Sequence, residues 1–440
     1  MKTGILFLLT TLIFYSCQQE IVKTEKLDNP FSDPSPWPEI RKERIQKLLP
    51  EAMKTAGVDA WVIICRENNN DPIAHHIGGE NAGGTALFLF HLEGDNVRSV
   101  VFSPIGEATA LGDLKIHDEV IPVERGNSAI SDASEYILSK NFSKIAVNSS
   151  FENALSDGLS YSQRLELEES LSNQSKNMVS SDDLIYEWLS VKLPAEVEIM
   201  TKAAELTANW QHEAYQQVVP GKSTDADIAK FLKNKLAEYG LKDGWSPDQN
   251  PNVNSGPDRG HSHSTDKVIM PGDVIQTDFG VRVWDMWVSD IQRFAYVLRE
   301  GETQAPDSVQ FYFESSIGGN RIALAAMKPG VLGYQVDKAQ RDWMAERGSE
   351  YVMWSTGHPV GYVAHDIGPN LGGGLLPDPS VRPAAMKPLK EGMLFAFDGF
   401  HAWKLPDGGT KTMSVEETAV VTKDGARYLI SPQEKLILIK

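Results

Sequence analysis

Five residues able to bind a divalent cation lie in the C-terminal half of the chain, each in or beside a run of β-branched and aromatic residues. They are Asp278 in TDFG, Asp290 in SDIQR, His358 in GHPVG, Asp398 in FAFDGF and Glu416 in SVEET. Runs of this composition predict strands or strand ends. Four carboxylates brought together by folding would repel one another unless cations lay among them. Oxygen ligands with one histidine nitrogen suit Mn, Co, Fe or Zn, and this many carboxylates can bridge two ions. The sequence therefore predicts a dinuclear metal hydrolase.

The elements around these residues predict two domains, as expected for a chain of 440 residues. Residues 39–188 contain a helix that ends before Gly57, followed by short apolar strands, which predicts a small α/β domain. Its predicted strands are 60–65, the hairpin of 85–91 and 97–103, and 144–150.

Residues 189–440 combine helices with mostly antiparallel strands, which predicts an α+β domain. The predicted helices are 195–218, 225–239, 307–327 and 333–347, and the predicted strands are 273–280, 282–288, 292–298, 394–401, 414–422 and 427–431. Asp278 and Asp290 lie 12 residues apart with strand-like sequence between them. A hairpin would place both carboxylates on neighbouring strands, within reach of one ion.

Together these stretches resemble the pita-bread metallopeptidase family, which includes methionine aminopeptidase, Xaa-Pro aminopeptidase, prolidase and creatinase. The resemblance covers residues from about 190 to 440. The preceding domain is similar to the N-terminal domain of the prolidase and creatinase branch. The resemblance implies a pita-bread catalytic domain with metal ligands at Asp278, Asp290, His358, Asp398 and Glu416.

The same resemblance implies roles for residues near the ligands. His261 lies 11 residues before Gly272, where the family carries a histidine that contacts the substrate, and His263 competes for that role. His365 follows His358 by seven residues and matches a second substrate-contacting histidine. Asp398 falls at the position of the carboxylate that accepts and returns the proton.

Three departures from the family pattern bear on activity. Asp398 stands in Asp-Gly-Phe where the family carries glutamate in Glu-Pro-Gly, so the carboxylate is one methylene shorter. The interval from Asp278 to Asp290 is one residue longer than usual. Ser414 stands where many relatives carry an arginine that helps to hold a dipeptide carboxylate. This last difference favours an aminopeptidase that acts on longer peptides over a strict dipeptidase.

The expected activity is that of an Xaa-Pro aminopeptidase with two divalent ions, manganese being the expected metal and Co, Zn or Fe the alternatives. One alternative is a hydrolase of another small amide or of a dipeptide. The other is a catalytically weak or inactive pita-bread protein that binds peptides, an interpretation prompted by Asp398. The resemblance also implies a homodimer.

The N-terminus predicts export and lipid attachment. Lys2 precedes an apolar run of 12 residues, which is too short to span a bilayer and is typical of a signal peptide. The run ends at Ser16-Cys17, which resembles a bacterial lipoprotein signal. We therefore expect a signal peptide at 1–16, acylation of Cys17 and a proline-rich tether over 17–38. The expected location is the bacterial cell envelope, as a periplasmic or outer-membrane lipoprotein.

Composition excludes one class of partner and one kind of bond. The formal net charge of −18 argues against nucleic-acid binding, which requires a basic face. Only Cys17 and Cys65 are present, so a lipidated Cys17 leaves no partner for an intramolecular disulfide. Cys65 ends the apolar run WVIIC and is expected to be a buried core thiol.

Overall fold

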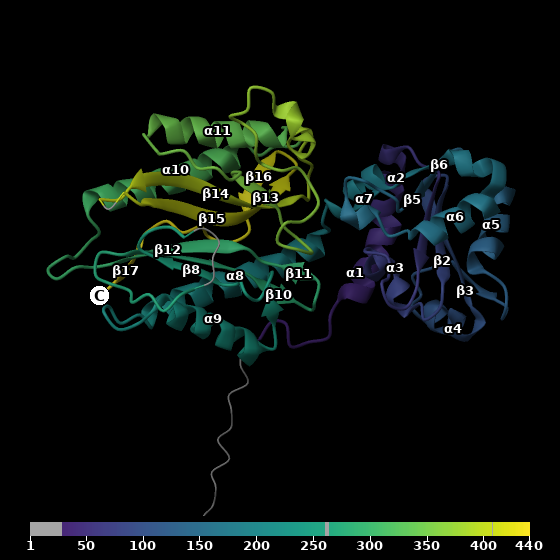
Figure 1. Cartoon of the computed structure of the whole chain (residues 1–440), viewed down its shortest axis with the longest axis horizontal. Helices are drawn as coiled ribbons and strands as arrows, with labels where there is room; N and C mark the ends of the chain where they lie inside the picture. The colour runs from purple at the N-terminus through teal and green to yellow at the C-terminus, as the bar shows by residue number, and fades with distance from the viewer. Residues whose placement is uncertain (1–28, 260–263, 407) are drawn as a thin grey trace, which may run out of the picture.

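The chain folds into two units, each with helices packed against its own main sheet (Figure 1). This computed structural model describes residues 29–259, 264–406 and 408–440. The predictions for the signal peptide, for Cys17 and for His261 and His263 therefore lie outside the described residues. Within the described ranges, no helix has the length and apolar character needed to cross a membrane.

The N-terminal unit is a six-stranded mixed sheet with the order β4-β3-β2-β1-β5-β6. Its central strand, β1, has all six residues buried, because helices cover both faces of the sheet. Trp61, Ile63 and Cys65 pack into one apolar cluster, whereas Ala60, Val62 and Ile64 pack into another on the opposite face. The elements are α1 (Trp37–Glu43), the π-helical turn η1 (Arg44–Leu48), α2 (Leu49–Ala56), β1 (Ala60–Cys65), α3 (Ala74–Ile77), η2 (Gly79–Asn81), β2 (Ala86–Glu93), β3 (Asn96–Pro104), α4 (Ile105–Asp113), β4 (Glu119–Val123), α5 (Ala129–Lys140), β5 (Ile145–Val147), η3 (Ala154–Ser156), α6 (Tyr161–Leu171), η4 (Ser172–Asn177), β6 (Met178–Ser180) and α7 (Asp182–Leu189).

The C-terminal unit is built on an eight-stranded sheet whose main path is β13-β14-β15-β12-β9-β8, with β16 beside β15 and β17 beside β12. Most of its strand pairs are antiparallel. The elements are α8 (Pro194–Gln216), α9 (Asp225–Tyr239), β7 (Lys242–Asp243), β8 (Asn252–Ser255), β9 (Val274–Phe279), β10 (Val281–Val283), β11 (Trp287–Val288), β12 (Ile291–Val297), α10 (Asp307–Ala326), α11 (Gly333–Glu346), β13 (Gly357–Pro359), η5 (Pro379–Val381), η6 (Pro383–Met386), β14 (Leu394–Lys404), β15 (Thr410–Thr422), β16 (Gly425–Tyr428) and β17 (Ile437–Ile439).

Two pairs of helices enclose this sheet. Figure 1 shows α10 and α11 on the side of β14 and β15, and α8 and α9 on the side of β8 and β12. The start of α9 is capped by a side chain: the Thr224 hydroxyl accepts a hydrogen bond from the Asp227 amide at 3.2 Å. The predicted α+β architecture of this unit, preceded by a smaller α/β unit, is confirmed.

One predicted strand is wrong. Residues 282–288 do not form a continuous strand, because Trp284 and Asp285 adopt left-handed backbone angles, φ 48° and 61°, and turn the chain. The segment becomes the short strands β10 and β11, which pair with each other and, through β10, with β7. This small sheet takes up the residues that separate Asp278 from Asp290.

Candidate metal centre

Strand register brings three of the predicted ligands to one face of the sheet. Asp278 on β9 lies opposite Gln292 on β12, and Gln292 in turn lies opposite Glu416 on β15. Glu416 is paired with Asp398 on β14. Because side chains directly opposite one another on antiparallel strands share a face, this single row carries three carboxyl groups across four strands.

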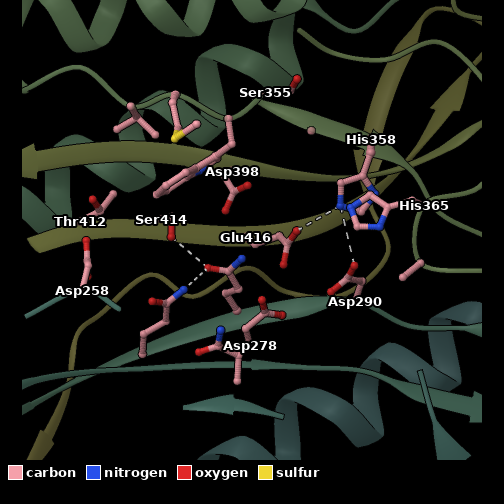
Figure 2. A pocket seen from close by; sticks show the side chains of 18 of the residues that line it. Asp258, Asp278, Asp290, Ser355, His358, His365, Asp398, Thr412, Ser414 and Glu416 are labelled. Carbon is pink, nitrogen blue, oxygen red and sulfur yellow. Dashed lines mark hydrogen bonds and ion pairs between the residues drawn. The ribbon is translucent and has the colours of Figure 1, made fainter. Parts of the chain in front are cut away.

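Asp290 and His358 complete the cluster from segments at the edge of this row. Asp290 directly precedes β12, and His358 lies on β13, next to β14. The His358 Nε2 atom lies 3.8 Å from Asp290 Oδ2 and 3.9 Å from Glu416 Oε1. One ligand atom from each of these three residues falls within 4.8 Å of the others, a spacing that accommodates a single cation. Figure 2 shows the four carboxyl groups around one space, with His358 at one end.

The carboxyl groups are buried and repel one another. Burial raises the pKa of the Asp290 carboxyl well above its ordinary range, and the charges of Asp278 and Asp398 raise it further. Burial and Asp278 act in the same direction on the pKa of Asp398. The pKa of Glu416 is also raised well above normal by burial, and then by Asp290, Asp398 and Asp278. A cation is the group that would relieve this repulsion.

The donor set fits divalent metal ions. The Asp398 Oδ1 and Glu416 Oε2 atoms are buried and have no hydrogen-bond partner within the described part of the chain. Buried carboxylate oxygens are ordinarily hydrogen-bonded or bound to a metal. Hard oxygen donors with one imidazole nitrogen are the ligands that Mn, Co, Fe and Zn accept.

The two predicted substrate-contacting histidines differ in what the structure shows of them. His365 lines the same cavity, is exposed, and lies with its ring centroid 4.1 Å from that of His358. His261, like its competitor His263, is outside the described residues. The structure therefore brings together Asp278, Asp290, His358, His365, Asp398 and Glu416 and says nothing of His261.

The cluster lies in an open cavity of about 1000 Å³. Figure 2 shows His358 and His365 at one end, and Asp258, Thr412 and Ser414 at the other. Beyond the carboxylates, the lining is rich in uncharged polar side chains, namely Asn252, Asn254, Gln276, Gln292, Thr410, Thr412 and Ser414.

The rim of the cavity carries apolar groups and a cation. Tyr351 and Met353 line the cavity and are largely exposed, and Trp245 and Trp354 also line it. Arg382, also exposed, is the arginine among the described lining residues. The other tryptophans near the motifs are packed elsewhere: Trp287 is fully buried, and Trp403 stacks on Tyr312.

Gln292 belongs to this site although the sequence did not single it out. Its Oε1 atom accepts hydrogen bonds from Ser414 Oγ at 2.9 Å and from Gln276 Nε2 at 2.7 Å. Its side chain also hydrogen-bonds Glu416, which opposes the rise in the pKa of that carboxyl. Gln292 follows Asp290 by two residues, so the alternation of side chains along a strand was the signal that could have identified it.

Comparisons with known proteins identify the fold and the family. Residues 198–423, about half of the chain, match the model of metallopeptidase family M24. The chain is 26% identical over 266 residues to the Xaa-Pro dipeptidase of Pyrococcus furiosus, and the aligned region covers 60% of this chain and 69% of that protein. It is 28% identical over 266 residues to the probable dipeptidase PepE of Mycobacterium tuberculosis, with 59% of this chain and 64% of that protein covered.

Solved structures cover most of the chain and show its fold. The X-Pro aminopeptidase of Thermotoga maritima superposes with a TM-score of 0.65 at 22% identity, covering 88% of this chain and all of that one. The Xaa-Pro dipeptidase of Bacillus anthracis superposes with a TM-score of 0.64 at 18% identity, covering 91% and 100%. At this identity the likeness establishes the fold, and the predicted pita-bread architecture with its N-terminal domain is confirmed. The chain belongs to metallopeptidase family M24.

Proposed function

We propose that this protein is a dinuclear metallo-aminopeptidase that removes the first residue from peptides with proline at the second position. The observation that carries the proposal is the cluster of four carboxyl groups and His358 on the floor of a large open cavity, in a chain of this family. The names of relatives, which include Xaa-Pro dipeptidases and an X-Pro aminopeptidase, support the proline preference.

Two divalent ions would be held by Asp278, Asp290, His358, Asp398 and Glu416, with manganese as the proposed metal and Co, Zn or Fe as alternatives. When bound, such ions lower the pKa of a water molecule and polarise the scissile carbonyl. Asp290, His358 and Glu416 supply the site for one ion, because their donor atoms already lie within 4.8 Å of one another. Asp278 and Asp398 extend the donor set toward the second.

The chain itself supplies proton transfer and substrate orientation. Asp398 Oδ1 is buried and free of hydrogen bonds within the described residues, so it is placed to take a proton from the attacking water and return it to the leaving nitrogen. The exposed imidazole of His365 is placed to donate a hydrogen bond to the carbonyl oxygen as charge develops there. His261 remains the proposed second donor.

The cavity favours peptides longer than two residues. Its volume of about 1000 Å³ lies at the upper end of the range for ligand pockets. Ser414 donates to Gln292 and offers no positive charge where an arginine would hold a dipeptide carboxylate. The amide and hydroxyl groups around it suit the neutral backbone of a continuing peptide.

Strict dipeptidase activity is the second candidate, and Arg382 is the observation that favours it. This exposed guanidinium lines the cavity and would pair with a carboxylate. The two candidates differ in which substrate is cleaved, so one assay separates them.

The test uses the soluble chain from Asp28 onward, loaded with Mn, Co or Zn. Release of free glycine from Gly-Pro-Leu, Gly-Pro and Gly-Ala-Leu would be followed by mass spectrometry, with Glu416→Gln as the inactive control. We expect cleavage of Gly-Pro-Leu and little cleavage of Gly-Ala-Leu. Cleavage of Gly-Pro alone would establish the dipeptidase, and cleavage of the tripeptides alike would refute the proline preference.

No hydrolysis with any metal would favour the peptide-binding alternative, in which Asp398 is too short to act as the base. Asp398→Glu tests this alternative directly, because it restores the missing methylene. A large gain in turnover would mean that aspartate compromises the enzyme. A loss would mean that the site is built around aspartate.

We also propose that the protein is a lipid-anchored homodimer of the bacterial cell envelope. The proposal for the anchor depends on Cys17 after its apolar leader, and that for the dimer on the family resemblance. Cys17→Ser expressed in bacteria should abolish incorporation of labelled palmitate and release the protein from membranes. Light scattering on the soluble chain should give twice the mass of one chain, and a single-chain mass would refute the dimer.

A further inference from the structure

Arg44 from the N-terminal domain is fully buried against the catalytic domain. Its guanidinium lies 2.7 Å from the Glu196 carboxylate, in the first turn of α8, and donates at 2.9 Å to the carbonyl oxygen of Val191. Arg44 begins the π-helical turn η1 between α1 and α2. A buried charge of this kind is costly unless each of its partners is held in place.

Glu196 connects this arginine to a loop beside the candidate metal centre. Its carboxylate, which is inaccessible to solvent, accepts four hydrogen bonds. Besides Arg44, the Leu193 amide donates at 2.9 Å, Trp287 Nε1 at 3.2 Å and the Tyr362 hydroxyl at 2.6 Å. Each carboxylate oxygen thus accepts two hydrogen bonds, and together they fix the orientation of the carboxylate.

Tyr362 belongs to the segment 359–368, which we call the histidine loop because it follows His358 and contains His365. Two buried cations lie over the Tyr362 ring, with Lys192 Nζ 4.7 Å and the Arg44 guanidinium 5.5 Å from its centroid. The ring of His76, from α3 of the N-terminal domain, meets it edge-on at 4.7 Å.

Asp366 fixes the other side of His365. Its carboxylate pairs with Lys192 at 3.0 Å and accepts from the amides of Tyr362 at 3.0 Å and Ile367 at 2.8 Å. The backbone of Gly361 packs closely against this ion pair: a Cβ atom at Gly361 would lie 2.3 Å from Asp366 Oδ2 and 2.4 Å from Lys192 Cε. The backbone on both sides of His365 is therefore held by buried charges.

We propose that the N-terminal domain positions His365 for reaction through Arg44, Glu196 and Tyr362, which makes these three positioning residues of the catalytic site. Arg44 orients Glu196, Glu196 orients the Tyr362 hydroxyl, and Tyr362 with Asp366 fixes the loop that presents the exposed imidazole. The N-terminal domain then contributes to the geometry of the active site, although none of these three residues contacts the substrate. The inference rests on the proposed function in one respect, namely that His365 contacts the substrate.

The kinetic test compares Arg44→Met and Tyr362→Phe with the control Arg41→Met. Arg41 is three residues earlier, is also buried, and pairs at 2.6 Å with Glu80 inside the N-terminal domain. Misplacement of a reacting group by about 1 Å can lower a rate by about a hundredfold. With Gly-Pro-Leu and Mn, we expect both test variants to lose about tenfold to a hundredfold in kcat.

Their KM should change by less than about threefold, because His365 acts on the charge that develops during reaction. Arg41→Met should keep its kcat within about twofold of the wild type. Arg44→Lys, which can still pair with Glu196, should recover most of the lost kcat. Equal kcat values for Arg44→Met, Tyr362→Phe and Arg41→Met would overturn the proposal and leave the network a domain interface only.

Hydrogen exchange provides a measurement that does not depend on catalysis. The amides of Tyr362 and Ile367 donate to Asp366, so we expect their exchange to be at least about tenfold faster in Arg44→Met and unchanged in Arg41→Met. Unchanged exchange in Arg44→Met would refute the proposal even if the wild type hydrolyses no peptide. If Arg44→Met does not fold, Tyr362→Phe decides the matter, because it removes a single oxygen and keeps the ring.

Discussion

Replacing Glu416 with glutamine should stabilise the metal-free protein, although it removes a proposed metal ligand. Glu416 and Asp290 offer oxygen atoms within 4.8 Å of each other. Two unit charges at that separation repel by about 3.5 kcal/mol at an effective dielectric constant of about 20. Burial raises the pKa of both carboxyls, and the neighbouring carboxyl groups raise it further, so the metal-free protein retains protons and avoids this repulsion.

The pH dependence follows from the direction of these shifts. An unfolded chain releases its carboxyl protons near pH 4, whereas the folded metal-free chain must keep them, so the metal-free protein loses stability as pH rises. We expect Glu416→Gln to raise its free energy of unfolding by about 2 kcal/mol at pH 8. That corresponds to a rise of roughly 4–8 °C in Tm for a domain of this size. The gain should vanish as pH approaches 4.

Added metal should remove most or all of the stability advantage of Glu416→Gln. At a concentration of Mn²⁺ about a hundredfold above its Kd, the wild type gains about 2.7 kcal/mol. Glu416→Gln should gain less than about 1 kcal/mol, because it lacks a ligand. Thermal unfolding with chelator and with Mn²⁺ measures both effects, and metal analysis of the same samples gives the number of bound ions.

Glu417 provides the matched control. It is adjacent to Glu416 and equally buried, but it pairs through both oxygens with Arg293 at 3.0 Å. Glu417→Gln leaves a buried cation without its partner, so we expect a loss of about 3–5 kcal/mol with or without metal and an unchanged gain from Mn²⁺. If Glu416→Gln instead destabilises the metal-free protein as Glu417→Gln does, the repulsion argument is wrong.

Three further outcomes are expected. Gly361→Ala should lower kcat/KM about a hundredfold in a peptidase assay, because a Cβ atom 2.3 Å from Asp366 Oδ2 must displace the ion pair of Asp366 and Lys192 that holds the histidine loop. Glu196→Gln should destabilise the protein in urea unfolding at pH 7: burial alone would raise the pKa of Glu196, but Arg44 and its hydrogen bonds hold it below 4.5. This difference should persist above pH 4.5 and shrink as pH falls below it, since protonation discharges the wild-type carboxylate. Ser414→Arg should raise the ratio of Gly-Pro to Gly-Pro-Leu cleavage about tenfold, because it adds a cation for the dipeptide carboxylate.

The elements that position the site could be predicted because their sequences are locally unambiguous. Helix 225–239 has Thr224 before it and Gly240 after it, and the structure gives the same bounds. Segment 282–288 has the composition of a strand and was predicted wrongly, since a left-handed angle at Trp284 is not a preference of that residue type. Tertiary pairing with β7 stabilises the turn there, and no local pattern shows it.

The positioning network was beyond prediction for a different reason. Arg44 and Glu196 lie 152 residues apart, and each occurs in a helical stretch where charged residues are ordinarily solvated. Tyr362 lies within the motif GHPVGYVAHD but resembles any tyrosine of a loop. Only the docking of the two domains makes these three residues neighbours, so their coupling depends on the tertiary fold.

The two adjacent glutamates of SVEET have different partners in the structure, and the local sequence does not predict which partner each one has. Both are buried, yet Glu416 faces like charges, while Glu417 faces Arg293 on the other side of the sheet. Alternation along β15 separates the two faces, but it does not say which face is the cavity. The register with Asp398 and Gln292 decides that, because it aligns Glu416 with the other carboxyl groups. A shift of one residue in β15 would only exchange the two glutamates, turning Glu417 into the cavity and Glu416 toward Arg293, which lies on β12 and does not move with β15. The same shift would turn Met413 and Val415, which are buried in the apolar cluster of Phe294 and Phe313, onto the cavity face, so apolar burial fixes the register in which the four carboxylates converge.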